Sequence, residues 1–346
     1  MNHWISVAVQ TPAHSSVAGP LTYRSELPLP PGTLVRAPLG SREVLGIVWS
    51  PADGPLDGRA AEATRAIAGA LEGIEPLSAP WLELVAFAAG YYQRALGELA
   101  LAALPPQLRE LSSTQLARRL KAGAGKPRDV SAGNAAGKSP DFIALSDQQT
   151  LALAEFESKP GPFLLFGATG SGKTEVYLHA VAALLERDPG AQALVMVPEI
   201  NLTPQLEARF NARFAPRYGD RSVVSLHSGM THPQRLKSWL AAHSGAARIV
   251  LGTRMAVFAS MPGLKLIVVD EEHDPSYKQQ EGARYSARDL AVYRGRLDGA
   301  KVLLGSATPS LESWHHSRPA TVDDPGGRYT RLVMPGRIGD AGFPKV

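Results

Sequence analysis

The chain contains no cysteine. This absence excludes disulfide bonds, thiol nucleophiles, and zinc or iron–sulfur sites held by cysteine. Long apolar runs are also missing, because strings such as residues 267–269 fall far short of the ~20 residues that a membrane span needs. The first residues carry no Lys or Arg and lead into no long apolar segment, unlike a secretory signal. We therefore expect a cytoplasmic protein with no membrane partner.

The composition is that of an ordinary folded protein. Hydrophobic residues make up 44% and charged residues 20% of the 346 positions. This length suggests two domains at ~150 residues each. The 36 Lys and Arg residues against 32 Asp and Glu residues leave a net charge of +4, and the basic excess lies after residue 160. A surface for a polyanion is therefore expected mainly in the second half.

The first hundred residues are predicted to form a small β-rich unit. Residues 4–9, 33–37 and 44–49 have the pattern of strands. A helix is predicted from Pro80, because apolar side chains follow it at helical spacing, at Trp81, Leu84, Val85, Ala88 and Tyr92. Residues 121–140 hold one β-branched residue and no aromatic, which predicts a flexible linker.

Short apolar strands alternate with helical stretches from residue 142 onward. The expected strands are residues 163–166, 193–197, 223–226, 248–251, 264–269 and 301–304. Nearly continuous apolar strands separated by helices predict an α/β fold, with a parallel sheet covered on both faces.

A glycine-rich segment after the first of these strands fits the phosphate-loop pattern G-x-x-x-x-G-K-[ST]. Its residues are Gly167, Ala168, Thr169, Gly170, Ser171, Gly172, Lys173 and Thr174. Lys173 would reach the β- and γ-phosphates of a nucleotide, and the Thr174 hydroxyl would bind Mg²⁺. The alternative is a glycine-rich turn that matches the pattern by chance.

Two further segments follow strands of the same predicted sheet. In the acidic segment, Asp270 would hold the metal through a water molecule and Glu271 would polarise the attacking water. The alternative is a solvated acidic turn. Ser306 and Thr308 come just after residues 301–304, and their small hydroxyl side chains suit a role in coupling the acidic segment to a neighbouring lobe.

These segments together resemble the first RecA-like lobe of superfamily 2 helicases. Further segments make the chain similar to the replication-restart helicases of the primosomal protein N′ (PriA) family, namely residues 35–40, 46–48, 88–111, 170–177, 197–205, 226–229, 252–258, 270–282 and 284–292. The resemblance implies a β-rich 3′-end DNA-binding domain at residues 1–107 and a RecA-like lobe at residues 142–317. A linker at residues 108–141 would replace the family's winged helix, and residues 318–346 would form a tail toward a second lobe.

The resemblance also implies an activity. It is ATP-dependent 3′→5′ DNA unwinding in primosome assembly and in the restart of stalled replication forks, with ATP and Mg²⁺ as cofactors. The implied partners are forked and single-stranded DNA, other primosome proteins and single-strand-binding protein, for a monomer associated with the nucleoid. The family's zinc has no cysteine ligands here. Because the second lobe would follow Val346, we expect a truncated chain that hydrolyses ATP poorly alone.

The resemblance assigns further roles in the lobe. Gln149 would read the adenine edge, although a polar residue at a helix start is the alternative. Arg254 would contact a DNA phosphate, with a salt bridge to an acid as the alternative. The family's aromatic-rich loop corresponds to residues 277–285, whose side chains would stack on bases and bind phosphates unless they only pack at the surface. Those side chains are Tyr277, Lys278, Arg284 and Tyr285.

In the N-terminal unit, Gly40 and Arg65 occupy the positions of the family's pocket for a DNA 3′ end. The alternative for Arg65 is a solvated charge on a helix. Thr22 stands where the family usually has an acid that accepts a bond from the terminal 3′-hydroxyl. The acidic group that would accept this bond is therefore missing here.

Two other functions remain open. A non-catalytic module that binds fork DNA and ATP would act only by occupying the fork. Substitution of Lys173 would therefore leave its function intact. A phosphate-loop ATPase or kinase unrelated to nucleic acid would show no DNA affinity and no weakening of binding with salt.

Overall fold

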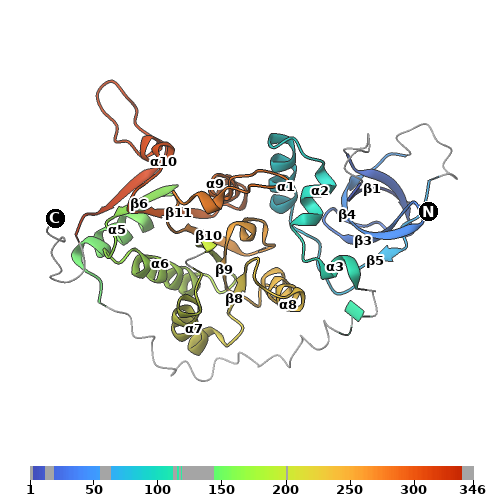
Figure 1. The fold of residues 1–346 in the computed structure, drawn as a ribbon, viewed down its shortest axis with the longest axis horizontal. Coiled ribbons are helices and arrows are strands. Elements are labelled where there is room, and N and C mark those ends of the chain that lie inside the picture. Colours follow the sequence, from blue (N-terminus) through green and yellow to red (C-terminus); the bar gives the residue numbers. More distant parts are fainter. Residues whose placement is uncertain are drawn as a thin grey trace.

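The structure is a computed structural model that describes residues 3–11, 19–54, 64–111, 115–116, 118, 144–199 and 202–336. A small N-terminal sheet and a larger sheet lie at opposite ends of a group of short helices (Figure 1). The predicted linker of residues 108–141 lies largely outside the described residues. Among the described residues, no helix has the length and apolar character that crossing a bilayer demands.

The N-terminal sheet is antiparallel, with the strand order β2-β1-β4-β3-β5. Its strands are β1 (His3–Val9), β2 (Leu21–Ser25), β3 (Leu34–Leu39), β4 (Arg42–Pro51) and β5 (Gly69–Ala70). Strands β1, β3 and β4 confirm the three predicted strands. The sequence does not predict β2, because Thr, Arg and Ser interrupt its few apolar residues. Gly40 lies in the β3–β4 turn with φ of 62°, a left-handed conformation that favours glycine.

Three helices connect this sheet to the rest of the chain: α1 (Ala79–Tyr91), α2 (Leu96–Ala102) and α3 (Gln107–Glu110). Helix α1 confirms the helix predicted from Pro80. Its first turn is capped by Ser78, whose hydroxyl accepts a hydrogen bond from the Trp81 amide at 3.4 Å. The buried face of α1 includes Trp81, Leu84, Val85 and Ala88, as the spacing predicts.

Helix α1 packs directly on the larger unit, chiefly on helix α9 (Ala287–Asp298). The Trp81 indole N–H donates to the Phe258 carbonyl at 2.7 Å. The rings of Phe87 and Tyr293 stack with their centroids 3.9 Å apart. The helices of the N-terminal half therefore share a hydrophobic core with the larger unit.

The larger sheet has seven parallel strands in the order β12-β6-β11-β10-β7-β9-β8. The strands are β6 (Phe163–Gly167), β7 (Gln192–Met196), β8 (Val223–Leu226), β9 (Ile249–Gly252), β10 (Leu264–Val269), β11 (Lys301–Ser306) and β12 (Thr330–Met334). All six predicted strands are confirmed. β12 comes from the stretch predicted as a tail, because Leu332 and Met334 are buried where it pairs with β6.

Helices cover both faces of this sheet, which confirms the predicted RecA-like α/β lobe. Its other helical elements are α5 (Asp147–Ser158), α6 (Lys173–Arg187), α7 (Pro204–Tyr218), α8 (His232–His243), α10 (Leu311–His316) and the short 3₁₀ turns η3 (Arg254–Phe258) and η4 (Pro275–Tyr277). Helices α5, α6 and α7 pack on one face. Helices α8 and α9, together with α1, pack on the other.

His243 joins the two parts of the molecule. It is 7% exposed, and its ring nitrogens lie 2.9 Å from the Ser260 hydroxyl and 2.8 Å from the Glu75 carbonyl. Burial lowers the pKa of His243 below its ordinary value of 6.5, against the opposing effect of Glu75. The neutral ring therefore stabilises the fold above pH 6.5, and this contribution is lost as the pH falls below that value.

We expect His243→Gln to lower the melting temperature by about 3 °C at pH 7.5, because a buried hydrogen bond contributes about 1 kcal/mol. The gap between the variant and the unsubstituted chain should narrow at pH 5.5, where the histidine gains a proton on unfolding. Thermal denaturation at both pH values measures this. A gap that widens at pH 5.5 would show that the histidine is protonated in the folded chain.

Candidate nucleotide and nucleic-acid site

The glycine-rich segment forms an open loop between β6 and α6. Gly170 and Gly172 have φ of 83° and 80°, in the left-handed region, and Gly172 is the N-cap of α6. A Cβ added at Gly170 would meet no atom within 4 Å. The loop therefore leaves open space in front of a helix N-terminus, where backbone N–H groups and the helix dipole favour phosphate.

Lys173 spans this loop. Its side chain is 7% exposed, and its ammonium donates to the Gly167 carbonyl at 3.0 Å. The same nitrogen lies 3.8 Å from a carboxylate oxygen of Glu271. The structure therefore brings together the predicted lysine and the predicted acidic segment.

Asp270 and Glu271 follow directly after β10. Burial raises the pKa of Asp270, and the neighbouring charge of Glu271 raises it further. A hydrogen bond from the Tyr177 hydroxyl to Oδ1 of Asp270, 2.9 Å long, opposes that rise. Glu271 has φ of 44°, a conformation that costs energy for a residue with a Cβ and that occurs often at functional sites.

The residues around the loop fit a magnesium nucleotide. Mg²⁺ in such sites takes one or two carboxylates, with phosphate oxygens and waters as its other ligands. Within the described ranges, no group of three His, Asp or Glu side chains is placed to hold a metal alone. The Ser171 hydroxyl is buried in the loop with no hydrogen-bond partner among the described residues, so it has capacity for a ligand.

The predicted coupling residues contact the acidic segment through His273. The Ser306 hydroxyl lies 2.8 Å from Nδ1 of His273, and the Thr308 hydroxyl lies 3.2 Å from Nε2. His273 also lies 3.7 Å from Glu271. The sequence prediction omits His273, although its position directly after the acidic residues is a signal that could have found it.

Glu272 is a second residue that the sequence prediction misses. It is 1% exposed and accepts hydrogen bonds from the Ser310 amide at 2.8 Å and the Ser313 hydroxyl at 3.0 Å. Arg288 lies 3.3 Å from the same carboxylate. Glu272 therefore ties the acidic segment to the start of α10 and to α9.

Gln149 lies in the first turn of α5, and its side chain hydrogen-bonds to the phosphate loop. Its side-chain oxygen accepts from the Ser146 amide at 2.8 Å and completes a capping box. Its amide nitrogen donates to the Gly172 carbonyl at 3.1 Å. The side chain is 2% exposed, so the structure shows the helix-start role, and adenine recognition stays a prediction.

Arg254 holds the segment expected as the aromatic-rich loop. Its guanidinium donates to the carbonyls of Ser276 at 2.9 Å and Lys278 at 3.4 Å. These partners are backbone carbonyls, and Arg254 forms no salt bridge with an acid of the described ranges. The contact of Arg254 with a DNA phosphate stays a prediction.

The stacking role expected for Tyr277 and Tyr285 does not fit this structure. The two rings are 2% and 7% exposed, so neither presents a face to a base. The Tyr277 hydroxyl donates to the Asp270 carbonyl at 2.7 Å, and Tyr285 packs edge-on against Phe258. Lys278 and Arg284 are exposed and remain available to phosphate.

Gly40 and Arg65 are brought together in the N-terminal unit. The Arg65 guanidinium donates to the Gly40 carbonyl, across 25 positions in the sequence. Close by, the Tyr23 hydroxyl donates to the Pro38 carbonyl at 3.1 Å. The Thr22 hydroxyl is buried without a hydrogen-bond partner among the described residues.

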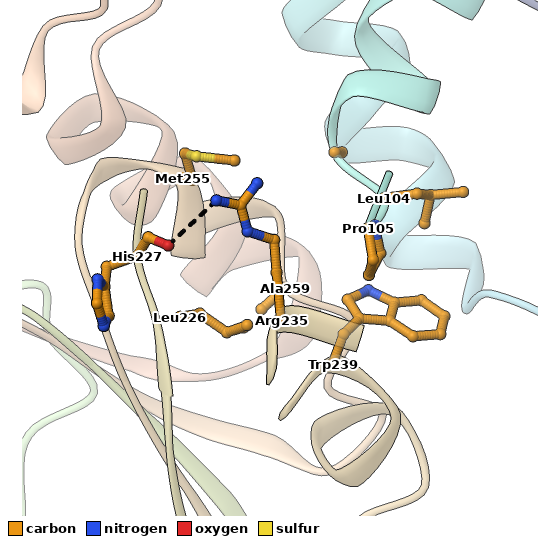
Figure 2. A pocket seen from close by; sticks show the side chains of 9 residues that line it. Leu104, Pro105, Leu226, His227, Arg235, Trp239, Met255 and Ala259 are labelled. Carbon is orange, nitrogen blue, oxygen red and sulfur yellow. Dashed lines mark hydrogen bonds between the residues drawn. The ribbon is translucent and has the colours of Figure 1, made fainter. Parts of the chain in front are cut away.

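A pocket that the sequence does not predict lies at the seam between the N-terminal helices and the lobe (Figure 2). Residues of the α2–α3 connection form one wall, and side chains of the lobe form the other. On the lobe side, the Arg235 guanidinium donates to the His227 carbonyl at 3.3 Å, drawn as a dashed line in Figure 2. The lining residues are Ala103, Leu104, Pro105, Leu226, His227, Arg235, Trp239, Met255 and Ala259. None of them belongs to the phosphate loop.

Comparisons with known proteins agree with this geometry. Residues 146–316 match the DEAD/DEAH box helicase family, and residues 6–105 match the 3′DNA-binding domain (3′BD) family. The replication restart protein PriA of Helicobacter pylori is 34% identical over 90% of this chain and 44% of its own length. PriA of Rickettsia conorii is 33% identical over 94% of the chain and 46% of its own length.

PriA of Haemophilus influenzae is 45% identical over 58% of this chain and 26% of its own length. The chain thus spans less than half the length of these relatives. The two matched segments follow one another along the chain, and each contains most of one of the two sheets. The chain therefore belongs to the PriA replication restart protein family and corresponds to its N-terminal portion, a 3′ DNA-binding domain followed by a DEAD/DEAH box helicase lobe.

Proposed function

We propose that this chain binds ATP with Mg²⁺ in the glycine-rich loop, as the first lobe of an ATP-dependent 3′→5′ DNA helicase. The observation that carries the proposal is the Lys173 ammonium, which spans the loop and lies 3.8 Å from Glu271. A buried cation between a glycine-rich loop at a helix N-terminus and an acidic segment matches the requirements of a magnesium-bound triphosphate. Lys173 would exchange its bond to Gly167 for the β- and γ-phosphates.

The other residues then take separate roles. Thr174 and Asp270 would hold Mg²⁺, which neutralises the charge that develops on the transferred phosphoryl group. Glu271 would orient the attacking water and accept its proton. Gln149 would place the adenine beside the loop that it already binds through Gly172. Ser306 and Thr308 would couple the acidic segment to a neighbouring lobe through their contacts with His273.

The DNA side of the proposal rests on both units. Gly40 and Arg65 would bind the 3′ end of a strand at a fork, and Arg254, Lys278 and Arg284 would act on single-stranded DNA in the lobe. We propose fork unwinding and replication restart, with other primosome proteins and single-strand-binding protein as partners, as activities of the whole protein. A module that binds fork DNA without catalysis is the alternative, and it would not depend on Lys173.

We expect Lys173→Ala to weaken the binding of a fluorescent ATP analogue in the presence of Mg²⁺. The loss should be on the order of 10- to 100-fold, because a charge-assisted hydrogen bond contributes about 1.5–3 kcal/mol. Lys159→Ala is the matched control, since Lys159 is an exposed lysine that pairs only with Glu155 among the described residues. Equal affinities for the two variants would contradict a nucleotide site in this loop.

We expect Arg65→Ala to weaken binding to a fork with a recessed 3′ end. A lysine or arginine that contacts one phosphate adds about 1 to the slope of log affinity against log salt, so this slope should fall by about 1. The control is Arg296→Ala, which removes an exposed arginine from the last turn of α9. Fluorescence anisotropy across a salt series measures both. The assignment of Arg65 fails if both variants show the same slope as the unsubstituted chain.

A further inference from the structure

Tyr177 is a buried tyrosine beside the acidic segment and is not one of the residues that would hold the nucleotide, the metal or the attacking water. It lies on α6 four residues after Lys173, so the two side chains lie on the same side of the helix. The side chain is 1% exposed. Its hydroxyl donates to Oδ1 of Asp270 at 2.9 Å.

The described residues hydrogen-bond both the main chain and the side chain of Asp270. Its backbone N–H donates to the Met196 carbonyl at 2.8 Å, and its carbonyl accepts from Tyr277 at 2.7 Å. These two bonds fix the main chain, and the main-chain N–H of Glu271 also hydrogen-bonds the carboxylate. The bond from Tyr177 engages Oδ1 and so adds a restraint on the side-chain torsion that comes from a different element, α6.

The Tyr177 hydroxyl packs against strand β11 at Gly305. A Cβ added at Gly305, on β11, would lie 1.6 Å from the hydroxyl oxygen and 2.8 Å from the ring carbon that bears it. Gly305 does not have a positive φ, so its backbone would accept another residue. A side chain at position 305 would therefore clash with the Tyr177 hydroxyl, and this clash explains the glycine there.

We propose that Tyr177 is a positioning residue for the magnesium-binding carboxylate, and that it acts by directing Oδ2 of Asp270 toward the ion. This inference rests on the proposed nucleotide site. Groups that hydrogen-bond a metal ligand orient it, and their removal typically costs about 10- to 100-fold in metal affinity. A tyrosine that only filled space would be replaced by phenylalanine without any effect on the ion.

The test is the Mg²⁺ dependence of nucleotide binding by Tyr177→Phe. Binding of a fluorescent ADP analogue is followed while Mg²⁺ is titrated, and binding is measured separately in excess EDTA. We expect the Mg²⁺ concentration that gives half of the Mg²⁺-dependent increase in nucleotide binding to rise about tenfold in this variant. Affinity in EDTA should not change, because Tyr177 contacts the carboxylate and not the loop. The spectrum of bound Mn²⁺ in electron paramagnetic resonance should change in the same variant.

Tyr92→Phe is the matched control, since it removes another tyrosine hydroxyl, which accepts from the Ser286 amide at 3.0 Å. It should leave the Mg²⁺ titration unchanged. A second variant tests the geometry, because Gly305→Ala should weaken Mg²⁺ binding by displacing the Tyr177 hydroxyl. In the Tyr177→Phe background, the same Gly305→Ala substitution should weaken Mg²⁺ binding by a smaller factor.

Each other outcome counts against the inference. An unchanged Mg²⁺ requirement in Tyr177→Phe overturns it while the proposed nucleotide site stands. Equal losses with Mg²⁺ and in EDTA overturn it as well, because they show a general effect on the fold. If the unsubstituted chain binds no nucleotide under either condition, the proposed site falls and the inference falls with it.

Discussion

The register of three neighbouring parallel strands is the constraint on which the candidate site depends. Strand β11 lies between β6 and β10, with Ser306 opposite Phe166 and Leu304 opposite Val269. The phosphate loop, the acidic segment and the coupling segment therefore all leave the sheet at one edge. Parallel strands present their ligands at the carboxyl ends, so this register alone brings residues from three separate stretches into contact.

The second constraint is the shared core between the N-terminal helices and the lobe. Trp81 of α1 bonds the main chain at Phe258, and His243 of α8 contacts the main chain at Glu75. These contacts are buried, so movement of one unit against the other would break hydrogen bonds in an apolar setting. The DNA-binding unit and the nucleotide lobe are thus connected through packed residues of α1, α8 and α9.

Much of the fold could be predicted because the central strands are buried on both faces and read as continuous apolar runs. The strands β2 and β12 were harder to predict, because each lies at the edge of its sheet and mixes polar with apolar residues. The phosphate loop has a distinctive spacing, whereas Tyr177 and Glu272 have no local pattern. Their roles depend on contacts with residues far along the chain, which spacing does not reveal. Tyr277 and Tyr285 show the converse, since tertiary packing buries rings that the sequence suggested for stacking.

We propose that the glycine-rich loop and the acids after β10 together hold a magnesium nucleotide. The most direct measurement is a crystal structure of the chain with Mg²⁺ and a non-hydrolysable ATP analogue. We predict phosphates inside the loop, the Lys173 ammonium moved from the Gly167 carbonyl to phosphate oxygens, and the ion between Thr174 and Asp270. A loop that stays empty at saturating nucleotide, or a nucleotide bound only at the seam beside Trp239, would show that the glycine-rich loop is not the nucleotide site.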